Sequence, residues 1–303
     1  MTDGFFDTVR TLDCNGRPLR LDRCRVMGIV NVTPDSFSDG GRHATTDVAV
    51  AHALRLVEEG ADVLDVGGES TRPGADAVSV EDELQRVVPV IERLARETNV
   101  PISVDTSKPE VMRAAVEVGA GMINDVRALS EPGAMEAASV LGVPVVLMHM
   151  KGEPRSMQEA PAYDDVVGDV HRFLAERIFA AEMAGIDKKR IVIDPGFGFG
   201  KTREHNLLLL SRMDRFVGLG VPVLAGLSRK RLIGELTGRD VPVDRVHGSV
   251  AAHLIAAQRG ARLVRVHDVA ATAEALRVWE AVAAMPAPVA RTDAPAIRWP
   301  DDD

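Results

Sequence analysis

The strongest constraint on the fold is a repeated alternation of short, apolar, β-branched runs with longer amphipathic segments. Eight runs are expected to form strands: Arg25–Val30, Val63–Val66, Pro101–Val104, Met122–Asn124, Val143–Met148, Ile191–Asp194, Pro222–Ala225 and Leu263–Val266. The unit recurs about every 34 residues, which is enough for a strand, a loop, a helix and a return. Because the runs are apolar without alternation, they are typical of parallel strands buried on both faces.

The segments between these runs have the periodicity and the end signals of helices. In Asp169–Gly185, apolar residues recur on one face. Ser79 followed by Asp82 predicts a helix that runs to about Thr98, and Pro109 fits the first turn of the next helix. Helices are expected to end near Gly60, Gly119, Gly185 and Gly260.

Eight such units with right-handed crossovers predict an α/β fold, a closed (β/α)8 TIM barrel in a single domain. A doubly wound open sheet is the alternative. The barrel is expected to span residues 25–285, with residues 1–24 as an N-terminal extension packed on it. Residues 286–303 are rich in proline and end in three aspartates, which predicts a flexible C-terminal tail.

The composition argues against several classes of protein. The 45 acidic residues outnumber the 36 basic ones and give a net charge of −9, so no nucleic-acid partner is expected. No apolar run approaches the roughly 18 residues of a spanning helix, so no membrane association is expected. Two cysteines are too few for a disulfide scaffold or a zinc cluster, and the N-terminus does not resemble a secretory signal. These features predict a cytoplasmic location.

Polar residues end or follow seven of the eight expected strands, at the edge where TIM barrels carry their chemistry. The positions are Asn31, Asp105, Asn124, Asp125, His149, Asp194, Ser228, Arg229, Lys230, Arg265 and His267. Any one of these residues could simply cap the following helix. Helix capping does not account for all of them together, so we expect a functional site at the carboxyl rim of the barrel.

Two loops at this rim, Thr33–His43 and Gly67–Ala75, exceed the roughly 2–6 residues that usually join a strand to a helix. They are rich in glycine, proline and hydroxyl groups. We interpret them as mobile lids over the site, with surface irregularity as the alternative.

A third segment, Asp194–Thr202, contains Gly200-Lys201-Thr202, which matches the end of a phosphate-binding P-loop. Pro195 stands where that motif needs its first glycine, so the P-loop interpretation fails. The glycines of the segment would instead let the backbone approach a flat ligand or an adjoining lid closely. Zinc-hydrolase and serine-nucleophile motifs do not occur in the sequence.

Basic residues at the ends of the last two strands indicate an anion site. Lys230 opens the helix after the seventh strand, and Arg265 and His267 alternate at the end of the eighth, which places their side chains on the same side of the backbone. Together with helix N-termini they could bind phosphate. The alternative is an ion-paired arginine in the barrel and a histidine of the core.

Several segments resemble those of the dihydropteroate synthase family, a group of pterin-binding enzymes. The two signature segments are Asn31–Gly40 and Asp65–Gly74, and the further matches are Ser103–Thr106, Ile123–Asp125, Met148–Met150, Ile193–Lys201, Ser228–Lys230 and Arg265–His267. They occur in the family's order over about residues 25–285. The resemblance implies a cytosolic TIM-barrel transferase of folate biosynthesis that needs Mg²⁺, is commonly a homodimer and is the target of sulfonamide inhibitors.

The implied reaction joins 7,8-dihydropterin-6-ylmethyl diphosphate to 4-aminobenzoate and gives 7,8-dihydropteroate and diphosphate. Diphosphate would leave with the help of Mg²⁺, and the amine would attack the pterin methylene carbon without a protein nucleophile. The resemblance implies these catalytic residues: Asp105, Asp194, Lys230, Arg265 and His267. It also implies that Asn31 is the protein ligand of Mg²⁺.

The resemblance further divides the substrate-binding residues into groups. Asp105, Asn124, Asp194 and Lys230 would bind the pterin, and Arg265 and His267 the diphosphate. The aminobenzoate pocket would be formed by Thr33, Pro34, Asp35, Thr71, Arg72, Pro73 and Phe199. Met148, Gly226 and Ser228 are also expected at the substrates. Arg231 follows Lys230 where some members carry serine, so the partner of the aminobenzoate carboxylate stays open.

Three alternatives remain beside this interpretation. A methyltetrahydrofolate methyltransferase domain would bind the same heterocycle, but the loop Ser70–Gly74 and the pair Arg265 and His267 argue against it. A paralogue that binds pterin without turnover is disfavoured by the intact loops. A sugar-phosphate aldolase usually needs a Schiff-base lysine inside the barrel or a set of metal-binding histidines, and neither is evident.

Overall fold

Eight parallel strands form the centre of the computed structural model, which describes residues 10–32, 42–70, 77–152, 157 and 161–286. The strands are β3 (Arg25–Asn31), β4 (Val63–Gly67), β5 (Ile102–Asp105), β6 (Met122–Asp125), β7 (Val145–Met148), β8 (Ile191–Asp194), β9 (Leu224–Ala225) and β10 (Leu263–Val266). They pair in the order β8-β7-β6-β5-β4-β3-β10-β9, and a parallel bridge between Ile193 and Val223 joins the two ends. The bridge closes the sheet into a barrel, so the TIM-barrel prediction is confirmed and the open sheet is excluded.

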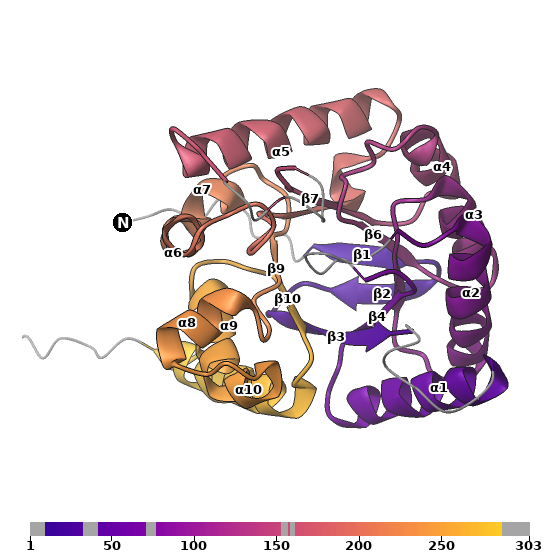
Figure 1. Cartoon of the computed structure of the whole chain (residues 1–303), viewed down its shortest axis with the longest axis horizontal. Coiled ribbons are helices and arrows are strands. Elements are labelled where there is room, and N and C mark those ends of the chain that lie inside the picture. Colours follow the sequence, from indigo (N-terminus) through magenta and orange to yellow (C-terminus); the bar gives the residue numbers. More distant parts are fainter. Residues whose placement is uncertain (1–9, 33–41, 71–76, 153–156, 158–160, 287–303) are drawn as a thin grey trace, which may run out of the picture.

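Helices follow the strands and surround the barrel (Figure 1). They are α1 (Arg42–Glu58), α2 (Val80–Glu97), α3 (Pro109–Glu117), α4 (Ala134–Leu141), α5 (Val166–Met183), α6 (Arg203–Ser211), α7 (Met213–Val217), α8 (Arg231–Thr237), α9 (Val246–Gln258) and α10 (Val269–Ala283). Short 3₁₀ turns lie at Lys188–Arg190 and Pro242–Arg245. In the described residues, no helix has the length and apolar character needed to cross a membrane.

The helix ends agree with their sequence signals. The Ser79 side chain accepts a hydrogen bond from the backbone N–H of Asp82 at 3.1 Å, and Thr98 caps the other end of α2. Pro109 is the first residue of α3, where its missing N–H costs no helical bond. Helices α1, α3, α5 and α9 each end two residues before a predicted glycine: Gly60, Gly119, Gly185 and Gly260.

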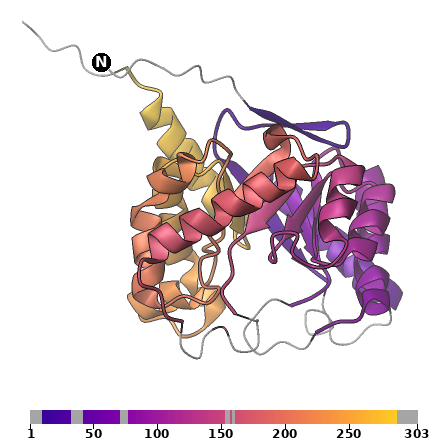
Figure 2. The same ribbon diagram turned by 90° about the horizontal axis from the view of Figure 1, so that it is seen from above.

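A hairpin closes the amino end of the barrel. Strands β1 (Thr11–Cys14) and β2 (Arg17–Arg20) pair antiparallel and lie across one end of the molecule (Figure 2). The apolar residues Leu12, Cys14 and Leu19 of the hairpin, with Leu21 just after it, form one buried cluster with side chains of the barrel strands. The barrel residues of this cluster are Met27, Val63, Met122, Val146, Val192, Leu224 and Leu263. Since the amino end is covered, the carboxyl end is the one that can receive ligands. The proposed division of the chain at residues 24 and 285 stays a prediction.

Candidate active site

The strand register aligns polar residues at the carboxyl rim. Asn31 on β3 pairs with Gly67 on β4, Gly67 pairs with Asp105 on β5, and Asp105 pairs with Asn124 on β6. A Cβ atom at Gly67 would lie 3.3 Å from Cβ of Asp105, so the absence of a side chain there leaves room for the carboxylate. Three predicted site residues therefore lie in one row across four neighbouring strands.

Arg265 on β10 connects this row to the interior of the barrel. Its Nη2 donates to Oδ2 of Asp105 at 2.6 Å, and its Nε donates to Oδ2 of Asp65 at 2.5 Å. The same Asp65 oxygen accepts from Nδ2 of Asn124 at 3.0 Å. The sequence analysis assigned no role to Asp65, which is fully buried. A charged residue inside an apolar strand was the available signal, because such a charge needs a partner.

Burial and neighbouring charges set the protonation of this cluster. Burial raises the pKa of Asp105, the nearby Arg265 guanidinium opposes the shift, and Asp65 adds to it. Burial by itself would lower the pKa of Arg265, but Asp65 and Asp105 raise it above its usual value. Arg265 therefore stays cationic, and the protonation state of Asp105 is the one that can change.

Asp194, Lys230 and Arg265 converge on the surface above Gly226. A Cβ atom at Gly226 would lie 3.8 Å from Asp194 Oδ2 and 3.9 Å from both Lys230 Nζ and Arg265 Cβ. Asp194 Oδ1 accepts the backbone N–H of Gly196 at 2.7 Å. The Asp194 carboxylate, the Lys230 ammonium and the start of the Arg265 side chain thus border one small space, and the Arg265 guanidinium connects it to Asp105.

The charges in this space shift one another. Burial raises the pKa of Asp194, and Lys230 is the main group that opposes the shift. Burial lowers the pKa of Lys230 to about 8, although Asp194 raises it. Both groups are therefore closer to neutrality than in water. Perturbed pKa values of this kind are typical of functional sites, where buried charged groups can form new contacts with a substrate.

The loop after β8 provides an aromatic wall. Lys230 Nζ donates to the carbonyl of Phe197 and lies 4.5 Å from the centroid of the Phe199 ring. Phe199 is partly exposed, whereas Phe197 is buried. Met148 on β7 pairs in register with Asp194, and a Cβ at Gly196 would lie 3.3 Å from Met148 Cγ. The predicted residues Met148 and Phe199 thus adjoin the space around Asp194 and Lys230.

A second polar pair lies at the ends of β9 and β10. Ser228 Oγ is 2.9 Å from Nδ1 of His267 and accepts the backbone N–H of His267 at 3.0 Å. Arg229 carries a positive φ of 56° and forms an ion pair with Asp268 at 2.5 Å. These contacts fix Ser228 and His267 beside Arg265, two residues earlier on β10.

Helix α9 holds the turn that carries Ser228 and Lys230. Nε2 of the buried His253 accepts the N–H of Leu227 at 3.2 Å, and Ser249 Oγ accepts the N–H of Arg229 at 2.9 Å. Ser249 and His253 are four residues apart, so they lie on the same face of the helix. The turn after β9 is therefore held by side chains of α9, the second helix after it in the chain.

Part of the predicted site lies outside the described residues. These positions are Thr33, Pro34, Asp35, Thr71, Arg72 and Pro73, together with most of the two long loops interpreted as lids. Arg231, which departs from the family pattern, bonds to Glu235 at 2.6 Å and is largely exposed. In the described residues, no group of three or more His, Cys, Asp or Glu side chains could hold a metal ion.

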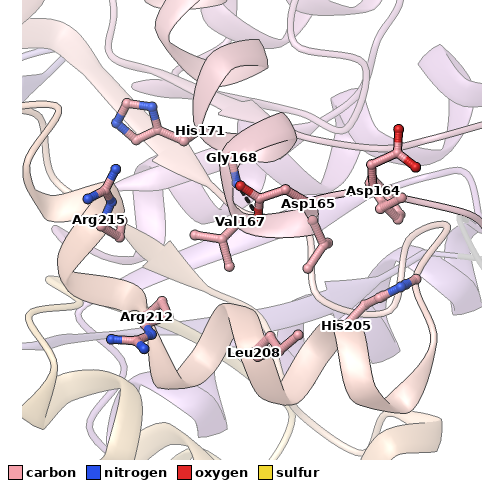
Figure 3. A pocket seen from close by; sticks show the side chains of 11 residues that line it. Asp164, Asp165, Val167, Gly168, His171, His205, Leu208, Arg212 and Arg215 are labelled. Carbon is pink, nitrogen blue, oxygen red and sulfur yellow. Dashed lines mark hydrogen bonds between the residues drawn. The ribbon is translucent and has the colours of Figure 1, made fainter.

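A separate surface cleft lies between the start of α5 and helices α6 and α7 (Figure 3). Its volume is about 510 Å³, and it is lined by residues that include His171, His205, Arg212 and Arg215. None of the predicted site residues lines it. The cleft is therefore distinct from the carboxyl rim.

Known proteins match this chain over most of its length. Residues 27–267 match the family model described as pterin binding enzyme. The dihydropteroate synthase of Escherichia coli K12 is 56% identical over 270 residues, which are 89% of this chain and 95% of that protein. The Xanthomonas albilineans dihydropteroate synthase with 4-aminobenzoic acid has a TM-score of 0.88 and 71% identity, and the match covers 92% of this chain and 100% of that chain.

Two further solved structures carry other ligands. The Xanthomonas albilineans enzyme in complex with 7,8-dihydropteroate matches with a TM-score of 0.84 and 68% identity over 91% of this chain and 100% of that chain. The Yersinia pestis dihydropteroate synthase with a sulfonamide drug matches with a TM-score of 0.86 and 50% identity over 91% of this chain and 100% of that chain. This chain belongs to the dihydropteroate synthases of the pterin-binding enzyme family.

Proposed function

We infer that this chain condenses 7,8-dihydropterin-6-ylmethyl diphosphate with 4-aminobenzoate to give 7,8-dihydropteroate and diphosphate, a transferase reaction of folate biosynthesis. The observation that carries this inference is the convergence of Asp105, Asp194, Lys230 and Arg265 at one end of the barrel. The names of the relatives and their bound ligands support the same reaction.

The pterin is proposed to bind against Asp105, Asn124 and Asp194. A dihydropterin presents an amino group, a ring N–H and a carbonyl on one edge, so it can donate to carboxylates and accept from Lys230. Because Asp194 is buried and Asp105 is largely buried, a ligand without those donors would leave their remaining carboxylate oxygens unpaired, at a cost of about 1–3 kcal/mol for each group. This cost makes the carboxylates the main source of selectivity for the heterocycle.

The diphosphate is proposed to bind next to Arg265 and His267. The bonds to Asp65 and Asp105 use two of the five N–H groups of the guanidinium, so others can donate to phosphate oxygens. Ser228 holds the ring of His267 beside them. The Arg265 guanidinium stabilises the charge that develops on the leaving group, and the anionic Asp105 and Asp194 stabilise positive charge on the pterin.

Mg²⁺ is proposed as the cofactor, with Asn31 as its protein ligand. The donor chemistry fits, because an amide oxygen is a hard ligand and Mg²⁺ usually completes its shell with substrate phosphates and water. Asn31 is partly exposed at the rim, in the row that contains Asp105. When bound, the ion would neutralise negative charge on the departing diphosphate.

The aminobenzoate is proposed to lie against Phe199 and Lys230. The Phe199 ring supplies an apolar surface, and Lys230 Nζ lies 4.5 Å from its centroid. The amine of 4-aminobenzoate attacks the pterin methylene carbon directly and then loses a proton, so the reaction needs no protein nucleophile. Sulfonamides, which resemble 4-aminobenzoate in shape, are proposed to occupy the same space.

We also propose that the protein is a cytoplasmic homodimer. Exposed apolar residues on α6 and α9, which are Leu207, Leu208 and Ile255, support an interface on this side of the barrel. The oligomeric state can be measured by sedimentation equilibrium.

The function is tested by following diphosphate release from purified protein. Release must depend on both 4-aminobenzoate and Mg²⁺, and chelation must abolish it reversibly. Asp105→Asn and Arg265→Ala are each expected to lower kcat/KM by about 100-fold or more, because each removes a charge that the transition state needs. Unimpaired turnover in both variants would overturn the assignment of the site.

A further inference from the structure

Lys201 is a buried lysine that the reaction itself does not use. Burial lowers the pKa of Lys201 well below its usual value, and the nearby Asp194 opposes the shift. Its residue is 3% exposed, although it lies close to the carboxyl rim. Nζ donates to the carbonyls of Gly196 at 2.8 Å and Phe199 at 3.0 Å, and it is 3.3 Å from the carbonyl oxygen of His149. It also lies 2.9 Å from Nδ1 of His149. These four partners are neutral groups that converge on one nitrogen atom.

The contacts of Lys201 join two adjacent parts of the rim. His149 follows β7, whereas Gly196 and Phe199 belong to the loop after β8. The two segments lie in direct contact: a Cβ at Gly196 would be 1.8 Å from the carbonyl oxygen of His149, and a Cβ at Gly200 would be 2.2 Å from that of Lys151. Only glycine fits at these two positions, and both have positive φ. The loop therefore lies flat on residues 149–151, and Lys201 fastens it there.

The same loop also contacts residues of the proposed substrate site. The carbonyl of Phe197 accepts from Lys230, and the Lys230 Nζ lies over the Phe199 ring. The N–H of Gly196 donates to Asp194. The loop that Lys201 contacts therefore carries the Phe199 ring next to Lys230 and Asp194.

The partner His149 is itself held rigidly. Burial and the neighbouring Lys201 lower the pKa of His149 to about 3, so the imidazole stays neutral. Its ring packs edge-on against Phe173 with centroids 4.9 Å apart. Lys201 therefore contacts a residue that is itself held in place by the barrel and by Phe173.

We propose that Lys201 is a positioning residue for 4-aminobenzoate: by fastening the loop Gly196–Gly200 to His149, it sets the place of the Phe199 ring. The pterin contacts at Asp105 and Asn124 come from other strands and do not depend on this loop. The proposal rests on the proposed function. It predicts that loss of the Lys201 amino group impairs use of 4-aminobenzoate more than use of the pterin diphosphate.

The test compares the two KM values in Lys201→Met, which has a similar length but no charge and no donors. We expect the KM for 4-aminobenzoate to rise by about tenfold or more and that for the pterin diphosphate by about twofold or less. Lys151→Met is the matched control, because Lys151 lies on the adjoining segment and is exposed, and its Nζ contacts the Ala162 carbonyl and the Tyr163 ring. It should leave both values unchanged.

A ratio of the two KM increases below about five overturns the proposal, whatever the change in kcat. Circular dichroism and thermal unfolding show whether each variant is folded. If Lys201→Met does not fold, Lys201→Gln, which keeps two N–H donors, is measured by the same criterion. Absence of condensation in the unmodified protein would instead refute the proposed function, so the two failures are distinguishable.

A double-mutant cycle with Phe199→Leu tests the route of the effect. If Lys201 acts through the Phe199 ring, the double variant should have nearly the same KM for 4-aminobenzoate as Phe199→Leu alone. Additive effects of the two substitutions would contradict this route.

Discussion

Arg265 and Asp65 are joined at 2.5 Å across the interior of the barrel, although they are 200 residues apart and Asp65 is completely buried. Asp65 also accepts from Asn124, so one carboxylate orients both a proposed diphosphate ligand and a proposed pterin ligand. Asp65 thereby acts on the substrates through its neighbours. Its carboxylate fixes the direction in which the Arg265 guanidinium faces the rim.

The first prediction concerns Asp65→Asn. The substitution keeps the shape but leaves the Arg265 charge with one carboxylate fewer, so we expect kcat/KM for the pterin diphosphate to fall by about 10–100-fold. The free energy of unfolding should fall by about 3 kcal/mol, since one partner of a buried ion pair is lost. Steady-state kinetics and urea unfolding measure the two effects.

Asp62→Asn provides the control for this prediction. Asp62 bonds to Arg23 at 2.5 Å and to Arg25 at 2.9 Å at the opposite end of the barrel, so it should lose stability without a change in KM. If Asp65→Asn affected stability alone, as Asp62→Asn should, the orienting role of Asp65 would be refuted.

The second prediction is a bell-shaped dependence of kcat/KM on pH. Lys230 must be charged, and its pKa of about 8 means that the cation is lost as the pH rises through that value. Asp105 and Asp194 must be anionic, and their raised pKa values mean that activity falls as the pH decreases, earlier than for exposed carboxylates. Lys230→Arg should move the alkaline limb upward, because an arginine stays charged. A profile that is flat from about pH 6 to 9 would contradict these assignments.

The sequence predicted the fold well because each strand is buried on both faces and each helix carries its own end signals. The hairpin β1–β2 was not predicted, although Asn15-Gly16 is the strongest short hairpin signal and both residues have positive φ. Its strands are only four residues long, which is too short for a clear periodic pattern. Their apolar residues are buried only by contact with the amino end of the barrel, and the sequence does not reveal that contact.

The site was predictable only where a residue stands at a strand end. Asp105 and Asp194 were found in this way, whereas Asp65 lies inside a strand and its partner Arg265 comes much later in the chain. Lys201 was considered only in a failed P-loop match and as the end of the family-like segment Ile193–Lys201, without a role of its own. Its role depends on His149, 52 residues earlier, and spacing along the chain does not reveal that contact.

The third prediction concerns stability in acid and uses His253. Burial lowers the pKa of His253 to about 3, so the folded protein binds fewer protons than the unfolded chain between about pH 6.5 and 3. The stability contributed by neutral His253 is present above pH 6.5 and is lost as the pH falls, by about 1 kcal/mol per pH unit. His253→Gln should remove this contribution, while its amide oxygen can still accept the Leu227 N–H.

The measurement is the difference in unfolding free energy between the unmodified protein and His253→Gln at several pH values. A difference is needed because Asp105 and Asp194, whose pKa values are raised, titrate with the opposite sign and stabilise the folded state as the pH falls. On acidification from pH 7 to 4, the variant should lose less stability than the unmodified protein. Parallel curves would show that His253 is not held neutral.

The last prediction uses Gly226 to test whether the space between Asp194, Lys230 and Arg265 holds substrate. An added Cβ would meet these side chains at 3.8–3.9 Å, which is ordinary contact, so Gly226→Ala should fold with a thermal midpoint within about 3 °C of the unmodified protein. The methyl group would nevertheless occupy part of the proposed pterin site. We therefore expect the KM for the pterin diphosphate to rise by about tenfold. Unchanged kinetics in the folded variant would mean that the pterin binds elsewhere, because no bound heterocycle could pack against Gly226 without meeting the added carbon.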